Sequence, residues 1–135
     1  MSLITWNNSF SVGVGEIDKQ HQLLIEIINE LHGAMTAGKG KEVLSSTLKK
    51  LIDYTKTHFS FEEVLFKQFA YENTQDHVIE HEQFVKKVAE FNDGFSRGDS
   101  ALSIEVLNFL ISWLTNHIKN EDKRYASCFN EHGMN

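Results

Sequence analysis

The chain has 135 residues, a net charge of −6 at pH 7, one cysteine and no proline. Its length suits one domain, residues 1–135, large enough to bury a functional site. No apolar stretch approaches the ~20 residues that a bilayer span needs, and the acidic charge disfavours nucleic acid, so we expect a cytoplasmic protein with neither membrane insertion nor a nucleic-acid partner. The single cysteine, Cys128, excludes an internal disulfide and an iron–sulfur cluster, so that any metal must bind nitrogen and oxygen.

Residues 1–17 show no sustained periodicity and are interpreted as an N-terminal arm, anchored by its aromatic residues Trp6 and Phe10. The first helix is expected to begin with Asp18 as its N-cap and to run to about Ala37, because glycines follow at positions 38 and 40. The side chains predicted to form its buried stripe are His21, Leu24, Ile28, Leu31 and Met35.

A second helix is expected over residues 41–70. Apolar side chains alternate at spacings of four and three along one face, and His58 and Glu62 fall on that face. These two polar side chains are therefore predicted to point into the interior.

The third helix is expected to begin after Asn73 or Thr74 and to end near Arg97, with His77 and His81 on its apolar face. The fourth is expected from near Ser100 to about Phe129. Its inward residues are predicted to be Leu107, Leu110, Leu114 and His117. Four amphipathic helices joined by short turns predict an all-α fold, an up-down-up-down four-helix bundle.

The inward polar side chains gather toward one end of this predicted bundle. Residues four apart share a helix face, so the pairs His58/Glu62 and His77/His81 each present two donor atoms about one turn apart. A single inward histidine is more often a hydrogen-bonded core residue than a metal ligand. Five of them with a carboxylate would be costly to bury without a cation, so the sequence predicts a metal site.

Four short motifs carry a resemblance to a known family. They are Ile17-Asp18-Lys19-Gln20-His21, His58-Phe59-Ser60-Phe61-Glu62-Glu63, His77-Val78-Ile79-Glu80-His81 and His117-Ile118-Lys119-Asn120-Glu121-Asp122. In order and spacing this set resembles the hemerythrins, in particular their single-domain bacterial members. The resemblance implies two iron ions with a bridging oxide or hydroxide, and dioxygen as ligand. It implies that His77, His81 and His117 hold one iron, that His21 and His58 hold the other, and that Glu62 and Asp122 bridge them.

Asp122 is the one implied ligand that regular helical spacing does not favour. Five residues after His117 is about 140° off its face, so spacing alone would favour Glu121 at four residues. Because the resemblance favours Asp122, we predict that a π-bulge in the fourth helix, or the reach of the side chain, brings Asp122 inward.

The implied ligand set leaves one coordination position open on the metal that has two histidines, since two six-coordinate metals need twelve contacts. Helix geometry predicts that this position has an apolar lining of Leu24, Trp113, Leu114 and Ile118, although plain core packing is an equal alternative for each. The hydrogen-bond acceptors expected to orient the imidazoles are Asp18, Glu63, Glu80 and Tyr125, with Glu80 interpreted rather as a solvated surface group. Core packing is the interpretation for Tyr54, Phe59, Phe66, Phe84 and Phe91, and neither His32 nor His132 is expected to be a ligand.

The leading hypothesis is reversible dioxygen binding for storage, transport or delivery, by a monomer without catalytic turnover that hands oxygen to a partner protein. A di-iron oxidase of the carboxylate-rich kind is disfavoured because no Glu-x-x-His occurs in the sequence. Slow reduction of peroxide or nitric oxide, oxygen or redox sensing, and zinc hydrolysis are the alternatives. Zinc, copper and manganese could occupy the same nitrogen and oxygen ligands.

Overall fold

The structure is a computed structural model that describes residues 3–98 and 102–134. Within these ranges every regular element is helical and none is a strand. The long helices are α1 (Gly15–Thr36), α2 (Gly40–Gln68), α3 (Thr74–Arg97) and α4 (Leu102–Trp113). A π-helical segment, η2 (Leu114–Glu121), continues α4, and the short helices α5 (Asp122–Arg124) and α6 (Ala126–Glu131) follow; a short 3-10 helix, η1 (Asn8–Phe10), lies in the arm.

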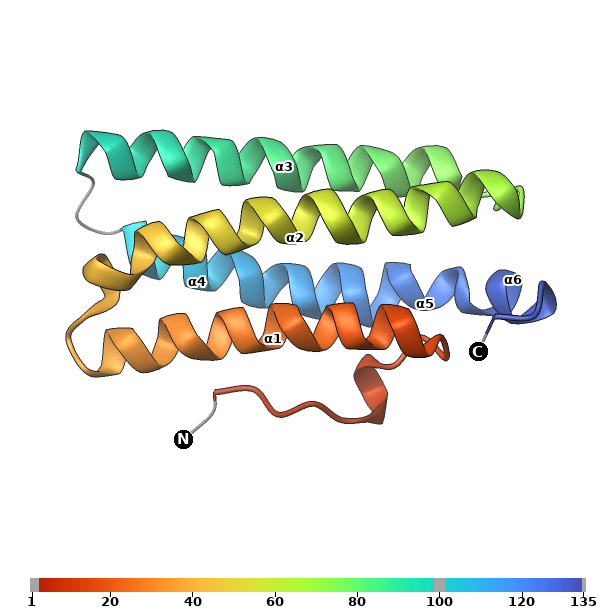
Figure 1. The fold of residues 1–135 in the computed structure, drawn as a ribbon, viewed down its shortest axis with the longest axis horizontal. Coiled ribbons are helices and arrows are strands. Elements are labelled where there is room, and N and C mark those ends of the chain that lie inside the picture. Colours follow the sequence, from red (N-terminus) through yellow and green to blue (C-terminus); the bar gives the residue numbers. More distant parts are fainter. Residues whose placement is uncertain (1–2, 99–101, 135) are drawn as a thin grey trace.

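The helices alternate in direction, so the predicted four-helix bundle is confirmed (Figure 1). The turn between α1 and α2 lies at one end of the molecule and the turn between α2 and α3 at the other, while α4, η2 and α5 together form the fourth rod. The predicted start of this rod near Ser100 lies outside the described residues. In the described part of the chain no helix is both long and apolar enough to cross a membrane.

The N-terminal arm lies against the bundle, as predicted, and runs along α1 (Figure 1). The backbone of Ile4 exchanges hydrogen bonds with the Asn29 side chain of α1 at 2.9 and 2.8 Å. Phe10 is buried in the core, Trp6 stacks against it with ring centroids 5.7 Å apart, and Lys119 Nζ lies 4.6 Å from its ring centroid. The contact with Lys119 holds the arm against η2 of the fourth rod.

The predicted N-cap role of Asp18 is wrong, because α1 already begins at Gly15 and the Asp18 amide donates to Val14 O at 2.9 Å. The Asp18 carboxylate instead accepts hydrogen bonds from Ser11 Oγ at 2.6 Å and from the Val12 amide at 2.9 Å. Asp18 lies in the first turn of α1 and its donors lie in the arm, so these hydrogen bonds hold the arm to α1.

The ends of α2 and α3 depend on left-handed residues. The prediction carried the second helix to Ala70, but Ala70 has φ +52°, and α2 ends at Gln68. Gly98, with φ +79°, ends α3 directly after Arg97, where the sequence predicted the end.

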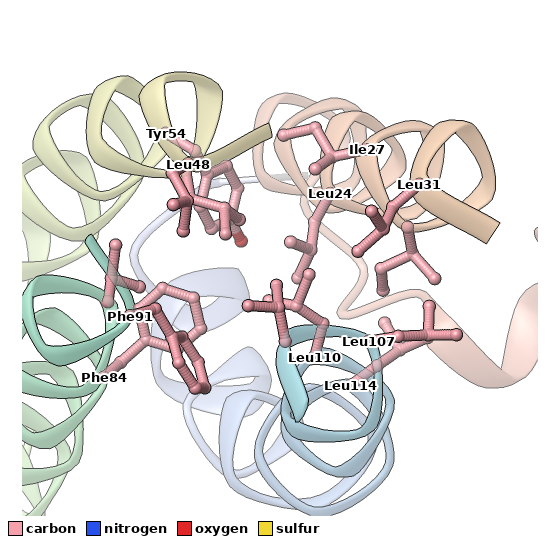
Figure 2. Close-up of a cluster of buried hydrophobic side chains, with 14 of the residues drawn as sticks. Leu24, Ile27, Leu31, Leu48, Tyr54, Phe84, Phe91, Leu107, Leu110 and Leu114 are labelled. Carbon is pink, nitrogen blue, oxygen red and sulfur yellow. The ribbon is translucent and has the colours of Figure 1, made fainter. Parts of the chain in front are cut away.

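The apolar core forms two clusters that lie one after the other along the bundle. The larger cluster fills the interior between the four helices (Figure 2) and includes Leu24, Phe59 and Ile118. The smaller one, around Ile17, Phe66 and Tyr125, closes the end where α6 lies. Along α1, His21 lies between Ile17 of the smaller cluster and Leu24 of the larger one, and along the fourth rod Asp122 lies between Tyr125 and Ile118 in the same way. A layer of polar residues therefore separates the two apolar regions.

Candidate metal centre

All seven predicted ligands lie in this polar layer, and each is at most 2% exposed. Four separate helical rods supply them, since α1 carries His21, α2 carries His58 and Glu62, α3 carries His77 and His81, and the fourth rod carries His117 and Asp122. The helical spacing that predicted inward orientation is therefore realised for every histidine of the set.

The two carboxylate oxygens of Asp122 face different histidines. Asp122 Oδ1 lies 2.8 Å from His77 Nε2 and 2.9 Å from His117 Nε2, while Oδ2 lies 3.0 Å from His21 Nε2. One carboxylate thus stands between the histidines of α3 and η2 on one side and that of α1 on the other.

Glu62 contacts the remaining imidazoles through one oxygen. Its Oε1 lies 3.0 Å from His81 Nε2 and 3.4 Å from His58 Nε2. Its Oε2 accepts a hydrogen bond from the Tyr125 hydroxyl, so Tyr125 orients the carboxylate rather than an imidazole.

Two overlapping groups of potential ligand atoms result, each with its atoms within 4.8 Å of one another. The first comprises His77, His81 and His117, the second comprises His21 and His58, and both include Glu62 and Asp122. The division into three and two histidines that share two carboxylates coincides with the division that the resemblance implied. The role of these residues as metal ligands stays a prediction.

The inward position of Asp122 depends on the π-helical segment η2. The Asp122 amide donates to His117 O, five residues earlier, and this extra residue per turn brings a side chain five positions on to nearly the same face. Asp122 is fully buried, whereas Glu121 is half-buried and pairs with Arg124 at 3.1 Å. The predicted widening of the fourth helix is confirmed.

Three imidazoles are held from behind by hydrogen bonds at Nδ1. His81 is bonded to Glu63 Oε2 at 2.8 Å and His117 to Glu80 Oε1 at 3.3 Å, so the interpretation of Glu80 as a purely solvated group is wrong. His58 Nδ1 donates to Gln20 Oε1 at 2.6 Å. Such bonds fix the ring orientation and leave Nε2 facing the centre.

Gln20 was missed by the sequence reasoning, and Asp18, which that reasoning favoured, faces the arm instead. Gln20 directly precedes His21, and its hydrogen bond to His58 places it on the side of α1 that faces α2. A helical wheel of α1 together with the position of α2 would have indicated Gln20. The wheel alone does not show which neighbouring helix Gln20 contacts.

Burial and the two carboxylates shift the pKa values of the histidines in the layer in opposite directions. Burial lowers the pKa of His58 from 6.5 to about 4, although the charge of Glu62 opposes this. For His77, the lowering of the pKa by burial is outweighed by the neighbouring carboxylates of Asp122 and Glu62, which raise the pKa from 6.5 to about 10. Despite burial, the surrounding histidines hold the pKa of Asp122 well below its usual range. Protons on imidazoles thus offset the carboxylates.

The unpaired atoms of the layer fit a metal. In the described part of the chain the buried atoms without a hydrogen-bond partner include Nε2 of His77, His81 and His117, Oε1 of Glu62 and both Oδ atoms of Asp122. Buried polar atoms are normally satisfied, and this many orphaned acceptors converging on one place indicate a cation. Imidazole nitrogen with carboxylate oxygen is a donor set that suits iron and its neighbours in the first transition row.

The predicted apolar lining is largely buried beside these ligands. Leu24, Leu114 and Ile118 belong to the larger core cluster, and each is at most 2% exposed. Trp113 is half-buried and stacks on His117 with centroids 3.9 Å apart, which places it beside the three-histidine group. The role of these four residues around a bound ligand stays a prediction.

The two other histidines lie outside both groups. His32 is half-buried near the far end of α1, eleven residues beyond His21. His132 is exposed and stacks on Phe69 with centroids 4.5 Å apart. Neither belongs to a group of potential ligands in the part of the chain that the structure describes.

Comparison with known proteins gives the class that this fold and site define. Residues 12–129 match the family model of the hemerythrin HHE cation binding domain. The chain belongs to the hemerythrin family.

Individual relatives agree over nearly the whole chain. The chain is 36% identical to a bacteriohemerythrin of Stenotrophomonas maltophilia, over 98% of this chain and 85% of that protein, and 33% identical to one of Methylococcus capsulatus, over 95% and 98%. A crystal structure of wild-type hemerythrin superposes with a TM-score of 0.83 at 32% identity and covers 94% of this chain and 98% of that one. The family prediction is confirmed.

Proposed function

We propose that this protein binds dioxygen reversibly at a pair of iron ions, for storage, transport or delivery, without catalytic turnover. The observation that carries the proposal is the unequal division of the histidines. Three belong to one group of ligand atoms and two to the other, while Glu62 and Asp122 belong to both. A metal held by two histidines and the shared carboxylates would keep a position for a small ligand.

The residues at the site would have two roles, to bind the metals and to exclude water from the site. One iron would be held by His77, His81 and His117, and the other by His21 and His58. The rings of His58, His81 and His117 are oriented by hydrogen bonds at Nδ1. The bound iron pair would supply the two electrons that dioxygen takes up on binding. Leu24, Leu114 and Ile118, all buried, would keep bulk water from the ligand.

Several observations support oxygen binding over the alternatives. The relatives over the full chain bear the name bacteriohemerythrin. The ligand set is rich in histidine, and the sequence lacks the Glu-x-x-His pairs of di-iron oxidases. The seven predicted ligands are each at most 2% exposed, which disfavours a hydrolytic enzyme whose substrate must reach the metal from solvent.

The test is an absorption spectrum of the iron-loaded, reduced protein, first without oxygen, then in air, then after purging. Visible colour that appears in air and disappears on purging is expected for reversible binding. Colour that persists until a reductant is added would contradict the proposal and indicate a redox enzyme. The same protein loaded with zinc is the matched control and should stay colourless at every stage.

A further inference from the structure

Tyr54 carries a buried hydroxyl group that the fold leaves without a partner. The side chain lies in α2 and is 3% exposed, and no atom in the described part of the chain hydrogen-bonds to its hydroxyl. Burying a polar group in this state costs stability, so native proteins rarely retain one without a reason. The sequence reasoning treated Tyr54 as ordinary core, which accounts for the ring but not for the oxygen.

The position of Tyr54 associates it with the two-histidine group. Its ring stacks on the imidazole of His58, with centroids 5.0 Å apart and planes 19° from parallel. Figure 2 shows the side chain reaching from α2 into the interior of the bundle, with its oxygen on the side of Leu24 of α1. Leu24 follows His21 by about one turn and Tyr54 precedes His58 by about one turn, so both side chains lie next to the two-histidine group.

The other tyrosine at the site, Tyr125, has a hydroxyl that does donate a hydrogen bond within the protein. Tyr125 is fully buried, and its hydroxyl donates to Glu62 Oε2. The hydroxyl of Tyr54 has no such acceptor. A phenol carries its proton at neutral pH, so this hydroxyl is available as a donor.

We propose that the Tyr54 hydroxyl is the hydrogen-bond donor for a small ligand in the open position of the two-histidine metal. This inference rests on the proposed function and adds a specificity-determining residue to it. A neutral donor beside an apolar wall favours ligands whose outer atom carries negative charge, such as azide or reduced forms of dioxygen, over neutral ligands of the same size. The pocket is then not wholly apolar, and one polar contact sets its preference.

The experiment compares azide binding to the oxidised, iron-loaded protein and to its Tyr54→Phe variant, followed by visible absorption. The substitution removes one oxygen and keeps the ring that stacks on His58. We expect azide to bind the variant roughly tenfold or more weakly, with unchanged iron content. Tyr71→Phe is the matched control, since Tyr71 is also buried but lies in the smaller core cluster at the α6 end, and its azide affinity should equal that of the unaltered protein.

Thermal unfolding of the metal-free proteins separates a ligand contact from a structural role. Because the hydroxyl has no protein partner, Tyr54→Phe should unfold at the same or a higher temperature than the unaltered protein. A lower unfolding temperature together with unchanged azide affinity would show that the hydroxyl serves the fold, and would overturn the inference. Equal azide affinities alone would also overturn it. If the unaltered iron-loaded protein binds neither azide nor dioxygen, the proposed function itself fails, and this inference with it.

Discussion

His58 is held at Nδ1 by the neutral amide oxygen of Gln20, at 2.6 Å, whereas His81 and His117 are held by the carboxylates of Glu63 and Glu80. A carboxylate behind an imidazole makes the ring a stronger electron donor than an amide does. The two metal positions therefore differ in the character of their ligands as well as in their number. The metal position proposed to bind oxygen includes His58, which is a weaker electron donor than His81 and His117 at the other position.

Replacing Gln20 with glutamate should make the two positions more alike. In Gln20→Glu the new carboxylate would strengthen His58 as a donor and stabilise oxidised iron, so we expect a lower reduction potential and faster loss of the oxygenated form in air. Spectroelectrochemistry and the decay of the visible band measure both. Gln22→Glu adds the same charge at an exposed position two residues away and should change neither.

Opening the apolar wall should expose the bound ligand to water. Leu24→Ala removes a fully buried side chain beside the site and should cost about 2–5 kcal/mol of unfolding free energy as well as accelerate oxidation of the oxygenated protein. Leu31→Ala is matched, because Leu31 is also fully buried in α1 but lies ten residues from His21, about 15 Å along the helix.

Chemical denaturation measures the stability of both variants, and absorption in air measures oxidation. Comparable losses of stability with faster oxidation only in Leu24→Ala are expected. Equal oxidation rates in the two variants would show that Leu24 contributes packing alone.

The carboxylate assignment in the fourth rod can be tested by metal content. Asp122 faces His21, His77 and His117, so Asp122→Asn should reduce the bound iron to well below two ions per chain. Glu121→Gln changes the adjacent, half-buried carboxylate, which pairs with Arg124, and should leave the iron content intact. The reverse pattern, measured by metal analysis after reconstitution, would assign the ligand to Glu121.

The metal-free protein should be most stable near pH 6.5. The pKa of His77 is raised to about 10, so its contribution is fully present below 6.5 and is lost as the pH rises toward 10. The pKa of His58 is lowered to about 4, so its contribution is present above 6.5 and is lost as the pH falls toward 4.

Denaturation of the metal-free protein from pH 4 to 10 checks this expectation. His77→Gln should flatten the alkaline limb and leave the acidic limb in place. An unfolding free energy that rises between pH 7 and 9 in the unaltered protein would show that His77 is not held protonated by Asp122 and Glu62.

The sequence by itself determined the helices, the bundle and the inward direction of five histidines and Glu62, because spacings of three and four place side chains on one face of any regular helix. Motif order, rather than spacing, indicated Asp122. Only the tertiary structure decided how Asp122 reaches the layer, through the bond from its amide to His117 O in η2, and which partners orient the imidazoles. Gln20 meets His58 across the packing of α1 on α2, and such a contact depends on the rotation and register of two helices, which the periodicity of either one does not contain.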